Sequence, residues 1–448
     1  MSAIPDHVET KIQSTWKPMQ ISLTFFSQVR SIGLKRAACK ALLDILLRPE
    51  LFFIEFAMGG NWGIKSAPHR ITLHDFAALR VWFQKDPLYG FGLAYINGML
   101  EVKSDVLSLI DSMNALRHTT KLSNFERLFF GFCLACLPKS ILESETYAFQ
   151  SEHKPHTIER DKEAVAYHYN LPLPFWQLLL SKSLLYTTGY YVEDSYAIDE
   201  ASEAKFAMAC RKIEIKNGES LLDVGCGWGG FLIYAAQKFP ESQFFGVTIA
   251  EDQARYAQER IKALGLDNCQ VTYLHIMEMD ERKKFDKIVA FQSTEHMQDD
   301  ELLLFFKKVH QLLRADGTLF IEFMNCKLNM KRATHKFMDS YIFPDGWQFP
   351  LVTGLESAEK AGFELFDLEG CHKDYERTIQ SWNDNFDKHF TACADAIGNI
   401  YRTRAMRLYF YWALWVAKSK RLKVHYCLWK KIDQEYWQAK RDFATCEK

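Results

Sequence analysis

The chain has 448 residues, and its 55 Lys plus Arg against 56 Asp plus Glu leave a formal net charge of −1 at pH 7. The length favours two domains, because a single hydrophobic core rarely grows beyond roughly 250–300 residues. The balanced charge argues against a nucleic-acid-binding protein that acts through its overall field.

Eleven cysteines occur, and they show no recurrent Cys/His spacing; the one C-x-x-C pair, Cys133 and Cys136, has no second pair or nearby histidine to complete a metal site. The sequence therefore indicates neither a metal site nor a disulfide framework, and a reducing cytosol fits best. The first residues, MSAIPDHVETKIQ, contain acids and no apolar core, so we expect no signal peptide. The longest apolar runs, 128–137 and 408–417, are about half of the roughly 20 residues that a membrane span needs. We expect a cytoplasmic protein that is soluble or peripheral to a membrane.

Residues 1–137 are expected to form a small α+β domain. Its most informative stretch, GFGLAYINGMLEV at 90–102, predicts a helix turn, a short strand and then a helix begun by Ser104 and Asp105. Residues 138–162 are polar and are interpreted as a linker. A second domain then occupies residues 163–448.

Strand and helix patterns alternate through the second domain after a helix at 198–213. Strands are expected at 220–224, 243–249, 270–276, 287–293, 318–324, 364–368 and 422–431, and helices at 251–264, 299–313 and 354–361. This order predicts an α/β fold with a doubly wound, mostly parallel seven-stranded Rossmann-like sheet that binds its ligand at the carboxyl edge. The helical stretch 375–420 is an insertion before the last strand, and the irregular segment 326–352 suits a lid or pocket wall.

The stretch SLLDVGCGWGGFLIYAAQKF, 220–239, predicts a buried strand, a glycine-rich turn and an amphipathic helix. Asp223 closes the strand, and Gly225, Gly227 and Gly229 let a ligand approach backbone amides without meeting a Cβ. The spacing is neither the dinucleotide pattern G-x-G-x-x-G nor a Walker loop. A plain tight turn is the alternative, although three glycines beside a strand-end acid exceed what a turn requires.

The glycine turn resembles the first motif of class I S-adenosylmethionine-dependent methyltransferases. Further stretches in order, AVAYHYNLPLPFWQLLLSKSLLYTTGYY, LDVGCGWGG, GVTIAEDQ, STEHM, YIFPDG and DYERTIQSW, resemble the cyclopropane fatty acid synthase family. That family methylates acyl chains of membrane phospholipids. GFGLAYINGMLEV is similar to the N-terminal domain of its bacterial phospholipid enzymes.

The resemblance implies S-adenosylmethionine as the cofactor and assigns its contacts. Tyr186 and Thr187 match positions at the methionine portion, beside the glycine turn, and Thr248 and Gln253 match the ribose contacts. A hydroxyl and an amide can pair with ribose oxygens. The adenine side matches less well, because HIME at 275–278 replaces an aromatic–acid pair of the family.

Methyl transfer to an alkene creates a carbocation, which needs a dry site with aromatic faces and then a base. Trp347, Phe349, Tyr375 and Trp382 supply aromatics in or after the expected lid, with ordinary core packing as the alternative.

The family holds a bicarbonate ion as the base, with a glutamate, a histidine, a tyrosine and backbone groups near a cysteine. Here Glu295, followed by His296, and Tyr375 match, whereas Glu322 stands at the histidine position and Thr188 at the cysteine position. The bicarbonate site is therefore altered. Glu322 is interpreted as a resident base that shares a proton with its neighbours, or as a strand residue paired with a lysine.

The leading functional interpretation is a C-methyltransferase on unsaturated phospholipid acyl chains, which gives cyclopropane or methyl-branched products. The alternatives are a coclaurine-type N-methyltransferase, because Ile321-Glu322 matches those relatives too, and a lipid-binding scaffold without activity. The expected partner is a phospholipid surface at the inner face of the membrane, because residues 401–431 carry nine Lys or Arg, no acid and a run of aromatics. No nucleic-acid partner is expected, because the overall charge is balanced. A solvated basic face is the competing interpretation, and a homodimer stays open.

Overall fold

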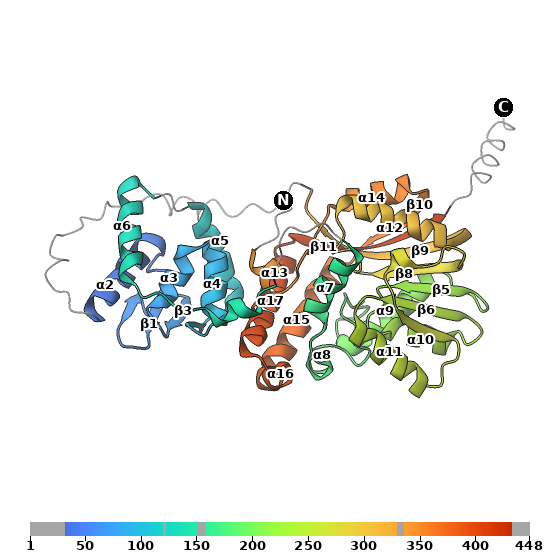
Figure 1. Ribbon diagram of the computed structural model, residues 1–448, viewed down its shortest axis with the longest axis horizontal. Coiled ribbons are helices and arrows are strands. Elements are labelled where there is room, and N and C mark those ends of the chain that lie inside the picture. Colours follow the sequence, from blue (N-terminus) through green and yellow to red (C-terminus); the bar gives the residue numbers. More distant parts are fainter. Residues whose placement is uncertain (1–31, 120–121, 150–156, 329–335, 432–448) are drawn as a thin grey trace, which may run out of the picture.

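The computed structural model describes residues 32–119, 122–149, 157–328 and 336–431. Parts of the expected first domain and linker, 1–31 and 150–156, lie outside these described residues. Two lobes are arranged along the longest axis, with the N-terminal lobe at the left of Figure 1 and the larger C-terminal lobe at the right. The helices of residues 372–418 lie between the lobes.

The N-terminal lobe contains a four-stranded sheet in the order β2-β1-β3-β4, with helices packed against it. Its strands are β1 Phe52–Phe56, β2 Asn61–Gly63, β3 His69–Leu73 and β4 Leu100–Val102, and its helices are α2 Ile32–Leu46, α3 Ala77–Gln84, α4 Pro87–Ile96, α5 Val106–Thr119 and α6 Asn124–Cys136. The helix–strand–helix expectation for 90–105 is confirmed by α4, β4 and α5. Asp105 begins α5, since its Oδ2 accepts a hydrogen bond from the Ser108 amide at 2.8 Å.

Short elements connect the lobes. The described part of the expected linker contains the 3₁₀ helix η2 (Glu143–Tyr147) and the start of α7 (Ile158–Tyr169), and α8 (Leu173–Leu179) follows.

The C-terminal lobe is built on a seven-stranded sheet in the order β10-β11-β9-β8-β5-β6-β7. Its strands are β5 Ser220–Val224, β6 Gln243–Thr248, β7 Cys269–Tyr273, β8 Phe285–Phe291, β9 Leu313–Cys326, β10 Phe363–Gly370 and β11 Leu422–Lys431. The pairs β7/β6, β6/β5, β5/β8 and β8/β9 are parallel, and only β11 is antiparallel to its neighbours. The predicted doubly wound sheet is confirmed.

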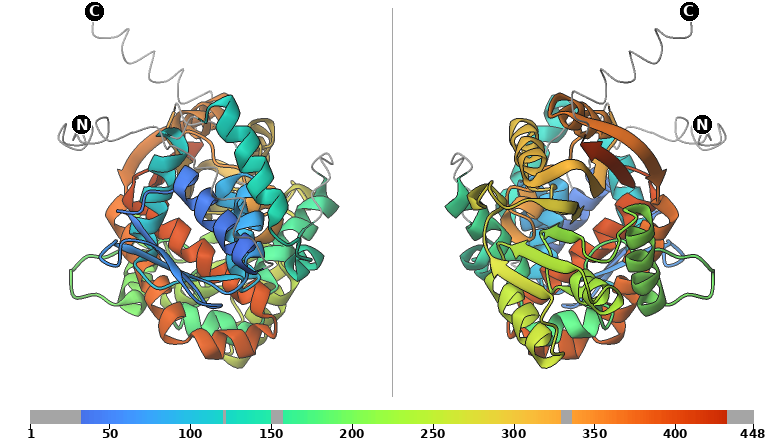
Figure 2. Two further views of the ribbon diagram at one scale, coloured as in Figure 1. Left: turned by 90° about the vertical axis from the view of Figure 1, so that its left-hand side faces the viewer. Right: turned by 90° about the vertical axis from the view of Figure 1, so that its right-hand side faces the viewer.

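Both faces of this sheet are covered by helices, as the end-on view at the right of Figure 2 shows. Leu221 packs into a core with α9 (Ile198–Lys212), α10 (Gly230–Lys238) and α11 (Glu251–Ala263). Leu222 packs into a second core with α12 (Asp299–Leu312) and α14 (Leu351–Lys360). Neighbouring residues of a strand point to opposite faces, so apolar runs fill both cores.

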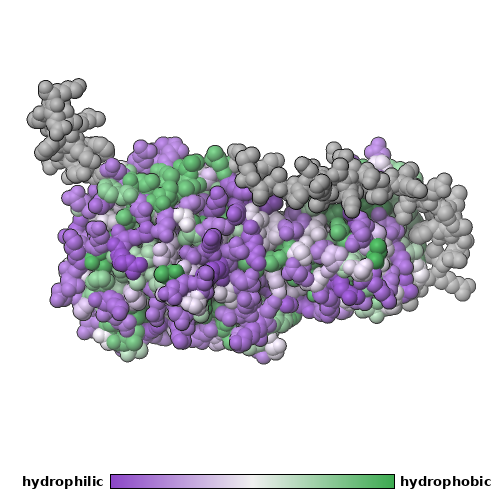
Figure 3. Space-filling view, turned by 180° about the vertical axis from the view of Figure 1, so that it is seen from behind, coloured by the Kyte–Doolittle hydropathy of each residue, from purple (hydrophilic) through white to green (hydrophobic). Residues whose placement is uncertain are grey.

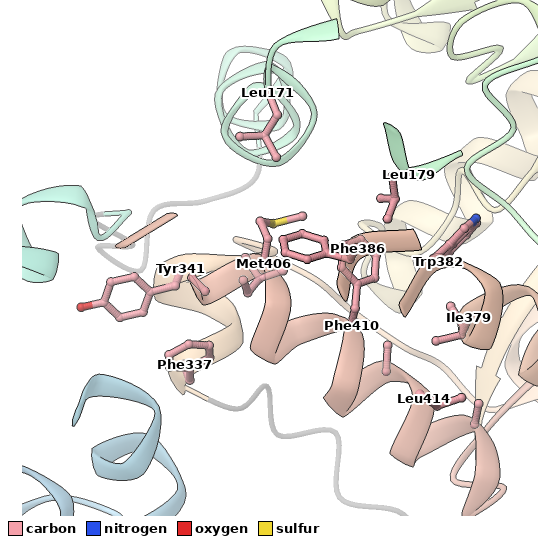
Figure 4. Close-up of a cluster of buried hydrophobic side chains, with 14 of the residues drawn as sticks. Leu171, Leu179, Phe337, Tyr341, Ile379, Trp382, Phe386, Met406, Phe410 and Leu414 are labelled. Carbon is pink, nitrogen blue, oxygen red and sulfur yellow. The ribbon is translucent and has the colours of Figure 1, made fainter. Parts of the chain in front are cut away.

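The predicted insertion before the last strand consists of α15 (His372–Lys388), α16 (Phe390–Ile397) and α17 (Ile400–Lys418). Figure 4 shows its apolar side chains gathered between α15 and α17, with Phe337 and Tyr341 of α13 (Lys336–Tyr341) nearby. A Cβ on Gly92 would lie 2.6 Å from the Phe337 ring. Gly92 therefore allows α4 of the N-terminal lobe to approach α13 closely.

Among the described residues, no helix combines the length and apolar character needed to cross a membrane. The back of the molecule is largely hydrophilic, apart from a hydrophobic area at the upper left of Figure 3.

Candidate active site

A cavity of about 420 Å³ opens at the carboxyl edge of the sheet, where the glycine turn was expected to bind its ligand. Seven of the eight predicted cofactor residues line it: Tyr186, Thr187, Asp223, Gly225, Gly227, Thr248 and Gln253. Gly229 does not. Its φ of +76° instead begins α10, and a Cβ there would lie 3.1 Å from that of Ala257 on α11.

The glycine turn leaves space where other residues would fill it. Gly225 has a φ of +75°, and a Cβ on it would lie 2.6 Å from the Cβ of Ser293. At Gly227, with a φ of +54°, a Cβ would meet nothing nearer than Gln253 Oε1 at 3.8 Å, so it would project into the cavity. The positive φ disfavours any residue with a side chain at both positions. At Gly225 the close contact with Ser293 disfavours it further.

Asp223 places a buried carboxyl group at the end of β5. It lines the cavity, and its Oδ1 has no hydrogen-bond partner among the described residues. Burial raises the pKa of this carboxyl to about 8, and the nearby Lys205 opposes the shift. A cationic amino group would satisfy this oxygen, so the cavity fits the amino-acid end of S-adenosylmethionine.

On the expected adenine side, His275, Ile276 and Met277 line the cavity, whereas Glu278 forms an ion pair with Lys162 at 3.1 Å. Asp161 on α7 also lines this side, 3.8 Å from His275 Nε2. Sequence reasoning missed Asp161, because it belongs to a stretch that was interpreted as linker.

A second cavity, of about 350 Å³, extends from the first toward the N-terminal lobe. Four residues line both cavities and so mark their junction: Tyr169, Tyr186, Gln292 and His296. Of these, the sequence singled out Tyr186 and His296. Tyr169 and Gln292 were missed, because nothing local in the sequence shows that α7 and the end of β8 meet.

The predicted catalytic residues Glu295 and Tyr375 also line the second cavity. Glu295 Oε1 accepts a hydrogen bond from the Met324 amide at 2.9 Å, and Oε2 has no hydrogen-bond partner within the described part of the chain. Burial raises the pKa of Glu295 to about 8, and the charge of Glu322 adds to the shift. The pKa of Tyr375 is raised as well, chiefly by burial.

Glu322 occupies a different environment from the one expected of a resident base. Its side chain is fully buried and forms an ion pair with Lys205, and its Oε1 accepts a 3.1 Å hydrogen bond from Gln292 Nε2. It lines neither cavity. The geometry therefore matches the alternative interpretation, a strand residue paired with a lysine, and the base role is left without a contact that supports it.

The aromatic residues divide into two groups. Tyr375 and Trp382 line the second cavity. Phe349 instead packs edge-on against Phe323 in the core, and Trp347 Nε1 donates to Asp299 Oδ1 at 3.1 Å. The core alternative therefore describes Phe349, whereas Trp347 is partly buried and lines neither cavity.

No group of three or more His, Cys, Asp or Glu that could hold a metal ion occurs in the described ranges. A doubly wound sheet, a glycine turn with an acid at its carboxyl edge and a second cavity at the same edge define an S-adenosylmethionine-dependent methyltransferase.

The comparisons identify its family. The family described as "Mycolic acid cyclopropane synthetase" matches residues 156–427, more than half of the chain, and the chain belongs to it. A probable fatty acid methyltransferase of Pseudomonas putida is 29% identical over 309 residues, which are 68% of this chain and 72% of that protein. The (S)-coclaurine N-methyltransferase of Papaver somniferum is 30% identical over 261 residues, 55% of this chain and 72% of that protein.

Among solved structures, mycolic acid cyclopropane synthase CmaA1 complexed with SAH and CTAB has a similar fold, with a TM-score of 0.56 and 24% identity. The match covers 62% of this chain and 99% of that one.

Proposed function

We propose that the enzyme transfers a methyl group from S-adenosylmethionine to a double bond in an acyl chain of a membrane phospholipid, giving a cyclopropane or methyl-branched product. The second cavity carries this proposal, because it meets the cofactor cavity at one end and continues between the lobes. An acyl chain is long and uncharged, so it requires an extended apolar cavity that reaches the cofactor.

The walls of the second cavity come from both lobes. The N-terminal lobe contributes Leu88 and Phe91 of α4 and Ile110 and Met113 of α5, and α17 contributes Leu408, Trp412 and Val416. These side chains are almost all apolar or aromatic, which suits a hydrocarbon chain. A small amine would not need a wall from a second lobe, so this feature favours a lipid over an amine.

The chemistry makes two demands on the protein. The alkene π electrons form the new carbon–carbon bond to the methyl group, which the cofactor supplies in activated form, and a positive charge develops on the other alkene carbon. The rings of Tyr169, Tyr186, Tyr375 and Trp382 present electron-rich faces around the cavity and would stabilise this charge. Removal of a proton from the new methyl group then lets its C–H electron pair close the ring.

Glu295 is the residue best placed to take that proton. It lines the cavity, and its Oε2 has no hydrogen-bond partner among the described side chains and backbone. With a pKa of about 8, its ionised form is a stronger base than an ordinary glutamate. His296, which lines both cavities, is the neighbouring group that could pass the proton on.

A membrane surface is the proposed partner. Arg421 lines the second cavity, and the exposed Lys418, Lys420 and Lys423 lie beside it in the α17–β11 turn. The remaining basic residues of 401–431 suit this role less: Arg402 bonds the backbone oxygens of Tyr167 and Tyr341, and Arg407 pairs with Asp387. We therefore place the contact with anionic headgroups at this turn, on the inner face of the membrane.

N-methylation of a small amine is the second candidate. The aromatic rings around the junction could hold an ammonium group as well as a carbocation, and the coclaurine relative carries the corresponding name.

Incubation of the purified enzyme with S-adenosylmethionine and vesicles of unsaturated phosphatidylglycerol, followed by mass spectrometry, tests the proposal. We expect acyl chains that have gained one CH₂, whereas fully saturated phospholipid should stay unchanged. Unmodified lipids together with methylation of a benzylisoquinoline amine would overturn it in favour of the second candidate.

A further inference from the structure

Gln292 lies where the two cavities meet, in a backbone conformation that glutamine rarely adopts. It directly follows β8, has a φ of +47° and lines both cavities. Its amide N–H donates to the Glu322 carbonyl oxygen at 3.0 Å, which holds the backbone in this conformation. A strained residue at a ligand junction points to a functional constraint on its side chain.

Hydrogen bonds determine which way the Gln292 side chain faces. Its Nε2 donates to Thr188 Oγ1 at 2.9 Å and to Glu322 Oε1 at 3.1 Å, which uses both amide hydrogens. An ionised carboxylate can only accept, so the nitrogen must be the atom turned toward Glu322. The carbonyl oxygen, Oε1, is therefore the polar atom that Gln292 offers to the cavities.

A buried ion pair fixes the Glu322 carboxylate in place. Lys205 on α9 pairs with the Glu322 carboxylate, and both side chains are fully buried. The Lys205 ammonium also donates to Thr187 Oγ1 at 2.5 Å and lies 4.7 Å from the Phe291 ring centroid. The pair thus joins α9, β9, the end of β8 and the 187–188 segment into one hydrogen-bonded unit, beside the cofactor cavity that Thr187 lines.

We propose that Gln292 is a positioning residue for the transferred methyl group. Its side-chain oxygen accepts C–H···O contacts from the sulfonium methyl group and directs that group toward the second cavity. Such contacts are weak for neutral donors, but the positive charge of a sulfonium polarises its C–H bonds toward a carbonyl oxygen. The Lys205–Glu322 pair acts through Gln292, because it holds the amide in the orientation that presents oxygen and not N–H. This inference needs only the cofactor, and not the phospholipid substrate.

The test compares binding of S-adenosylmethionine with binding of S-adenosylhomocysteine, which lacks the methyl group. Gln292→Met keeps the length of the side chain and removes the oxygen. We expect calorimetry to show affinity for S-adenosylmethionine reduced about two- to fivefold more than affinity for S-adenosylhomocysteine. With a ¹³C-methyl-labelled cofactor, the bound methyl proton resonance should lie downfield in the wild type and move upfield in the variant.

A second variant separates positioning from folding. Lys205→Met/Glu322→Leu replaces the ion pair with apolar side chains and leaves Gln292 in place. Because Gln292 then loses the partner that orients it, we expect this variant to show the same selective loss, and its combination with Gln292→Met to add nothing further.

Ser293→Ala is the matched control, since this neighbour lines only the cofactor cavity. We expect it to leave the affinity ratio unchanged. An unchanged ratio of the two affinities and an unmoved methyl resonance in folded Gln292→Met would overturn the inference. An unchanged ratio and an unmoved resonance in Lys205→Met/Glu322→Leu would show that the ion pair does not orient Gln292.

Discussion

The ammonium of Lys205 and the carboxylate of Glu322 form an ion pair from which solvent is fully excluded. The two residues are 117 positions apart in the chain. Burial lowers the pKa of Lys205, and the charge of Glu322 opposes that shift. Charge is therefore neutralised inside the wall of the site, whereas the Glu295 side chain lines the second cavity.

Loss of one member of this pair should cost far more than loss of both. Lys205→Met leaves a buried carboxylate without its cation, and we expect the free energy of unfolding to fall by about 3–5 kcal/mol. Lys205→Met/Glu322→Leu should recover most of that loss, as chemical denaturation would measure. Equal destabilisation by the single and the double variant would show that the unpaired carboxylate is not the cause of the loss.

Gly225→Val should abolish cofactor binding while the protein stays folded. The new side chain would meet Ser293 and would have to adopt a φ of +75° at the floor of the cofactor cavity. Calorimetry with S-adenosylhomocysteine measures the effect. Gly131→Val, on an exposed face of α6 where a Cβ meets nothing within 4 Å, is the control and should bind normally. Unchanged affinity in Gly225→Val would refute the assignment.

Stability of the cofactor-free protein should fall as the pH rises. The pKa of Glu295 is about 8 in the folded protein against 4.5 for an ordinary glutamate, so the folded state prefers the protonated form. The contribution of Glu295 to the free energy of unfolding is complete below pH 4.5. It is lost progressively as the pH rises through about 8, by at most roughly 1.4 kcal/mol per pH unit. Glu295→Gln cannot ionise and should show a shallower decline in thermal unfolding across this window. Identical pH profiles would show that Glu295 ionises normally.

Turnover should not respond to bicarbonate. The family positions that hold this anion are occupied by Thr188 and Glu322, and each of them accepts a hydrogen bond from Gln292. The Glu322 carboxylate is paired with Lys205 and offers no donor to a bound anion. Rates measured in buffer stripped of carbon dioxide and in buffer supplemented with bicarbonate should agree. A reaction that stops on stripping and recovers on addition would show that the anion is still the base.

Binding to anionic vesicles should depend on the α17–β11 turn. Replacing Lys418, Lys420 and Lys423 with glutamate removes three positive charges, each of which contributes about 1 kcal/mol at an anionic surface, and adds three negative ones. Sedimentation with phosphatidylglycerol vesicles should show binding weakened at least about 100-fold, and the salt dependence reduced. The exposed lysines 238, 262 and 283, changed together, form the control and should have little effect. Equal losses in both triple variants would indicate overall charge and not a defined contact.

Much of the catalytic lobe could be predicted from the sequence, because its signals are local. The strand that ends at Asp223, the glycines after it and the alternating strands and helices each depend on residues within one or two turns of chain. Such patterns determine the class of fold and the carboxyl edge at which the cofactor binds. The Glu295-His296 pair was found in the same way, as a strand-end acid at that edge.

The tertiary structure alone decided which side chains share the site. Gln292, Lys205 and Tyr169 carry no motif, and they become significant because strands and helices far apart in sequence bring them to one junction. It also turned Arg402 inward, placed Phe349 in the core and paired Glu322 with Lys205, against the simplest interpretation of each. A buried charge or amide is stable only with its partners, and those partners are chosen by the packing of whole elements, which no local pattern encodes.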